Sequence, residues 1–154
     1  MTPEKLHLAL NHIPLIGMGF AIIPLLFGLI SKSRPALLSG FMIATFAGWA
    51  TPFIMGAGEQ AYERYKHGEI RKQLDPGAVA ALETHEEIGH SWSKLLYATA
   101  VVASIGLVAA IYQPRSCKPL AWLLLLMCIA SVIAAVQIAD SGGKIRRPDF
   151  RQLK

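Results

Sequence analysis

Charged side chains are missing from four long stretches of this 154-residue chain, which cover residues 13–30, 35–58, 95–113 and 119–139. Each stretch is close to the length of about 20 apolar residues that crosses a bilayer core of about 30 Å. Inside lipid every backbone polar group must be paired within the protein, so such runs form helices. The sequence therefore predicts an all-α fold, a polytopic integral membrane four-helix bundle surrounded by a lipid bilayer.

Cysteine is also scarce. Cys117 and Cys128 form no C-x-x-C pattern, and their spacing matches neither a zinc ligand set nor a heme-attachment motif. The net charge of +5 comes without a basic patch interleaved with aromatic residues, which argues against nucleic acid as a partner. Metal binding through thiolates and nucleic-acid recognition are therefore excluded from the expected functions.

Four spans leave little chain for a separate soluble part, so we expect a single domain over residues 1–154. The connection at about 59–90 carries most of the charge and is expected to be helical and outside the membrane. Asp75 is a good helix cap and Pro76 suits the first turn, which predicts a helix start near Pro76.

The charges of the connections conflict over sidedness. The short connections 31–34 and 113–118 contain Lys32, Arg34, Arg115 and Lys118 and no acid, a pattern typical of cytoplasmic loops. The opposite side holds ten Lys and Arg residues, and the rule counts basic residues rather than net charge. From the residues alone, the topology stays open.

Histidine is the one chemically informative residue type. His7 and His12 enter the first hydrophobic helix five residues apart, and His85 and His90 enter the third at the same interval. Odd-numbered spans run in the same direction, so all four imidazoles are expected at one membrane surface. Placing several imidazoles at the ends of lipid-buried helices costs free energy unless something binds them. The pattern therefore predicts a metal or heme site.

A five-residue step along a helix turns a side chain by about 140° and raises it by about 7.5 Å, so each helix can offer one inward histidine at a given height. One histidine from each helix provides two axial nitrogens for a b-type heme. We prefer His12 with His90, which stand nearest the uncharged spans, over the outer pair His7 and His85, and we expect one heme. Room for the flat ring would come from Gly17, Gly19 and Gly89.

A second interpretation uses carboxylates. Glu4 and His7, and likewise Glu87 and His90, form Glu-x-x-His pairs that share a helix face, and Glu59 could add a ligand from the second helix. Such sets hold non-heme iron or another di-metal centre in an enzyme. Those bundles also need a carboxylate from the fourth helix, where Asp140 is the only candidate. We rank this interpretation well below heme, because Glu-x-x-His is short enough to recur by chance at any charged helix end.

A third interpretation is a non-catalytic structural subunit of a larger membrane complex, whose histidines contact headgroups or water. The preferred function is instead an electron-transfer subunit rather than a stand-alone enzyme. Its electron donor would be a quinol or a soluble cytochrome, although no residue pattern identifies a quinone pocket.

Both chain ends resemble a known family. His7-x4-His12-Ile13-Pro14 is similar to the His-Pro-x-x-Val-His-Phe-Pro opening of an uncharacterised family of four-helix bacterial membrane proteins. Gly142-Gly143-Lys144-Ile145 is similar to that family's Gly-Gly-Glu-Leu close. This chain has Leu8 where the family has proline, and its third helix begins with unusually many acids.

Some members of that family are joined to c-type cytochrome modules. The resemblance therefore implies electron transfer with a redox partner such as a cytochrome c. It also implies a bacterial inner membrane location with the histidine-bearing face in the periplasm. Only His7, His12 and the two histidines of the third helix carry over.

Overall fold

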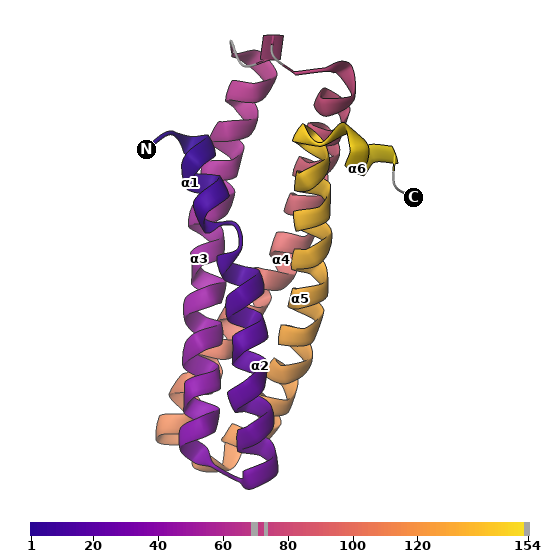
Figure 1. Ribbon diagram of the computed structural model, residues 1–154. Helices are drawn as coiled ribbons and strands as arrows, with labels where there is room; N and C mark the ends of the chain where they lie inside the picture. The colour runs from indigo at the N-terminus through magenta and orange to yellow at the C-terminus, as the bar shows by residue number, and fades with distance from the viewer. Residues whose placement is uncertain (69–70, 73, 153–154) are drawn as a thin grey trace.

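The computed structural model describes residues 1–68, 71–72 and 74–152, and the described chain is helical without strands. Its elements are α1 (Pro3–Leu10), α2 (Ile13–Ser31), α3 (Arg34–His67), α4 (Pro76–Tyr112), the short 3-10 turn η2 (Pro114–Ser116), α5 (Cys117–Arg146) and α6 (Pro148–Gln152). The long helices run up and down as a four-helix bundle, with both termini at the same end (Figure 1). The predicted all-α bundle is confirmed.

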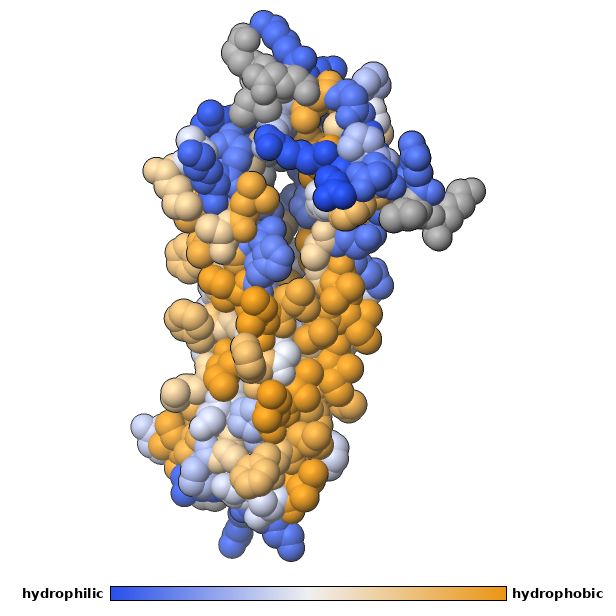
Figure 2. Space-filling view, in the orientation of Figure 1, coloured by the Kyte–Doolittle hydropathy of each residue, from blue (hydrophilic) through white to orange (hydrophobic). Residues whose placement is uncertain are grey.

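Four helical segments are long and apolar enough to cross a membrane: Pro3–Ser31, Arg34–His67, Pro76–Tyr112 and Cys117–Arg146. Apolar side chains cover the middle of the visible face, between a polar upper end and a smaller polar lower end (Figure 2). Large ones such as Phe46 and Phe53 point outward, with about three-quarters of their surface exposed. Exposure of this kind suits hydrocarbon rather than water, so the chain fits an integral membrane protein in a lipid bilayer.

Small residues set the helix spacing inside the bundle. A Cβ atom added to Gly48 of α3 would lie 2.6 Å from the Cβ of Ala100 on α4, so these backbones approach closely. Gly106 of α4 similarly leaves the space that the ring of the fully buried Phe41 fills. In lipid no hydrophobic effect drives helices together, so they associate through van der Waals contacts. Small residues strengthen these contacts because they let two helix backbones approach closely.

The first span is divided, although the sequence suggested one helix carrying both of its histidines. α1 ends at Leu10 and α2 begins at Ile13. Pro14 has no N–H to donate to the carbonyl four residues earlier, which belongs to Leu10, and its ring crowds that carbonyl. His7 and His12 therefore lie on opposite sides of a break in the helix.

The expected helical connection extends both neighbouring helices beyond the uncharged stretches. α3 continues to His67 and is followed by Gly68, and α4 begins at Pro76 as predicted. The Asp75 side chain caps α4 by accepting a hydrogen bond from the Ala78 N–H at 3.0 Å. At the opposite end Arg34 donates to the Ala110 carbonyl, which joins the start of α3 to the end of α4.

Candidate functional site

His7 of α1 and His85 of α4 face each other at the end of the bundle that carries the termini. Their ring centroids lie 6.3 Å apart and their planes are inclined by 79°. Both side chains are half-buried. Of the four candidate histidines, these are the two whose rings the structure brings together.

The His7 ring is fixed by α3. Its Nδ1 lies 3.0 Å from the carbonyl oxygen of Ile54. A carbonyl can only accept, so Nδ1 carries the proton and donates it. In the neutral ring the lone pair is then on Nε2, which has no hydrogen-bond partner among the described residues.

The His85 ring is fixed in the same way by α5. Its Nδ1 lies 2.8 Å from Ser141 Oγ, and that hydroxyl donates its only proton to the Ile138 carbonyl, also at 2.8 Å. Ser141 must therefore accept from His85, which places the proton of this imidazole on Nδ1 as well. In the neutral ring Nε2 of His85 again has the lone pair, and it has no partner in the described chain.

Two glycines make space for these rings. A Cβ atom on Gly58 of α3 would lie 2.9 Å from both Cε1 and Nδ1 of His7. A Cβ on Gly142 of α5 would lie 3.1 Å from Cε1 of His85. Any larger residue at either position would press on the ring, so both glycines belong to the site.

Sequence reasoning had assigned room for a cofactor to other glycines. Gly17 instead packs against Ala47, Gly19 has nothing within 4 Å of an added Cβ, and Gly89 only approaches Met55 at 3.9 Å. Gly58 was missed, whereas Gly142 lies in the Gly-Gly pair of the family-like close and could have been found from that signal.

His12 and His90, the preferred pair, are both exposed. Nδ1 of His12 contacts Oδ1 of its neighbour Asn11, and Nε2 of His90 lies 3.8 Å from Glu86 on the preceding turn. Within the described chain no contact joins the two rings. The preference for His12 and His90 was based on their depth in the helices. The structure instead turns His7 and His85 inward, because of the rotation of α4 and the break in the helix before Pro14.

The carboxylates of the di-metal interpretation are not gathered. Glu4 is paired with Arg64, whose Nε lies 2.9 Å from Glu4 Oε1. Glu59 and Glu87 are exposed. In the part of the chain that the structure describes, no group of three or more His, Cys, Asp or Glu side chains is placed to hold a metal ion.

The site lies toward the end of the bundle that carries the chain termini (Figure 1). α1 packs on α3. Figure 2 shows a hollow on this face, just below the polar upper end.

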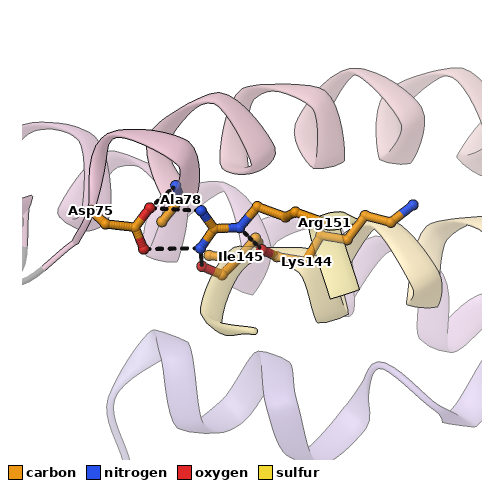
Figure 3. Close-up of polar contacts among 5 residues, drawn as sticks. All are labelled: Asp75, Ala78, Lys144, Ile145 and Arg151. Atoms are coloured by element: carbon orange, nitrogen blue, oxygen red, sulfur yellow. Dashed lines mark hydrogen bonds and ion pairs between the residues drawn. The ribbon is translucent and has the colours of Figure 1, made fainter. Parts of the chain in front are cut away.

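The C-terminal segment turns aside at the end of α5, at this end of the molecule (Figure 1). Arg151 forms a bidentate ion pair with Asp75, with distances of 2.6 and 2.9 Å, and also donates to the carbonyls of Lys144 and Ile145 (Figure 3). These bonds tie α6 to the end of α5 and to the start of α4. Sequence reasoning missed this contact, which links residues 76 positions apart.

The same contact changes the acidity of Asp75. The Arg151 guanidinium, helped by the N–H groups at the start of α4, holds the pKa of Asp75 at about 2, below its ordinary value of 3.8. The carboxylate is therefore charged throughout the physiological range. It can cap the helix and hold Arg151 at the same time.

No protein-family model, curated protein or solved structure matches this chain. The resemblance of its two ends to the four-helix bacterial family thus stays a prediction. What the chain can do chemically has to be argued from the imidazole pair itself.

Proposed function

We propose that the chain is a membrane redox subunit that binds one b-type heme between His7 and His85 and transfers electrons. The observation that carries this proposal is the pair of facing imidazoles with free Nε2 atoms. Metal-ligating histidines commonly donate their other ring N–H to a carbonyl or similar acceptor, which fixes the tautomer and the ring orientation. Ile54 and Ser141 serve as those acceptors here.

The separation of the rings suits a metal between them. Two metal–imidazole bonds of about 2 Å each place the ligating nitrogens roughly 4 Å apart. The ring centroids lie 6.3 Å apart, which is compatible with that separation of the nitrogens. A bound heme would supply one-electron chemistry, and His7 and His85 would hold its iron.

The chain offers two candidate ligands at one end and no histidine at the other end of the bundle. A single heme there cannot carry electrons across the membrane, so a partner must complete the path. We place the chain in the bacterial inner membrane with the histidine-bearing end in the periplasm. A cytochrome c on that side, or a quinol in the bilayer, would be the redox partner.

An absorption spectrum of the protein purified from membranes tests the proposal. Heme gives a Soret band and, after reduction, an α band. His7→Ala and His85→Ala should each remove these bands, because each leaves one axial ligand. His12→Ala and His90→Ala are the matched controls, since both rings are exposed, and should retain the full signal.

If the His12 and His90 variants lose the bands and the His7 and His85 variants keep them, the ligands are His12 and His90. Bound iron or manganese without a Soret band would favour the di-metal enzyme. A protein free of both, purified under conditions that preserve other b-type hemes, would leave a structural subunit.

A further inference from the structure

The first span is held in the bundle differently on the two sides of its break. α2 buries five residues, among them Met18, Ala21 and Leu25, whereas α1 buries none. The apolar side chains of Leu6 and Leu8 on α1 are exposed instead. Segments with few buried contacts are the ones that open most readily, so α1 is the least firmly packed part of this span.

Two polar contacts on one face attach α1 to α3. Glu4 lies 2.9 Å from Arg64, and His7 donates to the Ile54 carbonyl at 3.0 Å. Glu4 and His7 are three residues apart, so both side chains lie on the same face of α1. About half of the Arg64 side chain is exposed, and ion pairs that water reaches contribute little to stability. α1 can therefore leave α3 without exposing a packed core.

The break at the end of α1 has the properties of a hinge. Asn11 and His12 lie between α1 and α2 and belong to neither helix. Pro14 has no N–H to continue the helical hydrogen bonds across them. Hinges are typically a few residues at the end of an element, whose backbone angles absorb the movement. Beyond the break α2 is held by α3 and α5 together.

α1 covers one side of the imidazole pair. α2 packs on α5 as well as on α3, whereas α1 packs mainly on α3. The bundle is therefore less closed around α1 than around α2, and the hollow in Figure 2 lies at this height. His85 and its partner Ser141 belong to α4 and α5, so they stay in place when α1 moves. Movement of α1 withdraws His7 and uncovers His85.

From these features we propose that α1 is a gate that turns about Asn11 and His12. In the open position it gives a planar cofactor of the heme type access to His85. In the closed position it returns His7 as the second ligand. Entry of the cofactor rests on the proposed function, whereas the movement of α1 does not.

Spin labels on the full chain, in nanodiscs without heme, measure the movement. Leu8→Cys and Thr84→Cys place nitroxides at exposed positions of α1 and α4, and both native cysteines are buried. Double electron–electron resonance should find two populations of label separation. Glu4→Gln removes the charge that pairs with Arg64 and should raise the population with the longer separation about twofold to fivefold.

Glu63→Gln is the matched control for the spin-label experiment. It neutralises the acid next to Arg64 on α3, which pairs with His67 rather than with α1. The two populations should stay as they are in the labelled parent. Circular dichroism and gel filtration verify that each variant keeps its helical content and size.

A crosslink tests whether the movement admits the cofactor. Glu4→Cys with Arg64→Cys, joined by a short bis-maleimide, ties α1 to α3 and leaves both imidazoles in place. The control is the same double variant with each thiol capped by N-ethylmaleimide. Added hemin should develop its Soret band about tenfold more slowly in the tied protein, and both samples should reach the same final absorbance.

Equal rates of hemin uptake in the tied and capped proteins overturn the gate and leave the heme proposal in place. A single narrow label separation that Glu4→Gln does not change overturns the movement itself. If no sample binds hemin while Glu4→Gln shifts the two label populations, the movement of α1 stands and the proposed heme function fails.

Discussion

The His7 ring occupies space that exists because residue 58 is glycine. Its Nδ1 is committed to the Ile54 carbonyl, so the ring cannot retreat from an added Cβ without losing that hydrogen bond. A typical hydrogen bond contributes about 0.5–1.5 kcal/mol. Glycine at position 58 is therefore part of what orients the imidazole.

Gly58→Ala tests this role. Replacing a helical glycine with alanine stabilises a helix by roughly 1 kcal/mol, which the displaced His7 ring should offset. Gly19→Ala is the matched control, because nothing lies within 4 Å of its added Cβ. Thermal unfolding in one detergent should find Gly58→Ala about 1 kcal/mol less stable than Gly19→Ala. Equal stabilisation by the two substitutions would show that His7 is not held by its neighbours.

The sequence singles out histidine as the candidate residue type for a site, but it does not predict which two rings lie together. His7, His12, His85 and His90 stand out because imidazoles at the ends of apolar runs require a reason. Choosing between the pairs needs the rotation of α4 and the entry angle of α1, which depend on tertiary packing. The distance of a histidine from the uncharged stretches does not tell which way its side chain points.

Among the helices, the boundaries that could be predicted are those with a local cause. Asp75 and Pro76 start α4 because one side chain caps and the other fits the first turn. The break before Ile13 has an equally local cause in Pro14, yet Pro24 lies inside α2 without ending it. A proline leaves the carbonyl four residues earlier without its helical hydrogen bond. Whether the helix ends there depends on what surrounds that carbonyl in the folded protein, and the sequence does not specify this.

The ion pair between Asp75 at the start of α4 and Arg151 of α6 should weaken at low pH. Because the pKa of Asp75 is depressed to about 2, its ion pair contributes fully above the unfolded-state pKa of about 3.9 and is lost as the pH falls through about 2. Pepsin cleavage at Phe150, which packs on Gly143, should therefore accelerate between pH 4 and pH 2. A free peptide covering residues 144–154 corrects for the pH dependence of the enzyme.

Two variants separate the ion pair from the helix cap. Asp75→Asn keeps a good capping side chain but removes the charge, so it should release α6 at every pH and leave the start of α4 intact. Asp75→Ala should do both and lower the melting temperature further. If Asp75→Asn shows the wild-type cleavage profile, the Arg151 contact does not hold α6 in place.

The four spans could be predicted because crossing lipid imposes a length and an apolar composition on each helix. The distribution of acidic residues along the chain is equally uneven. No Asp or Glu occurs between residues 5 and 58 or between residues 88 and 139, so every acid lies toward the end that carries the histidines. The other end has only Lys32, Arg34, Arg115 and Lys118.

The proposed redox role requires one orientation of the chain. The short loops with Lys and Arg favour the cytoplasm for residues 31–34, whereas the ten Lys and Arg residues of the opposite end favour the reverse by number. The redox role needs the first orientation, with residues 31–34 cytoplasmic and Thr84 on α4 periplasmic. Both native cysteines are buried, which keeps background labelling low. In right-side-out vesicles an impermeant maleimide should therefore label Thr84→Cys but not Ser31→Cys, and in inverted vesicles the preference should reverse. The opposite pattern would place the imidazole pair on the cytoplasmic side, where a periplasmic cytochrome could not reach it.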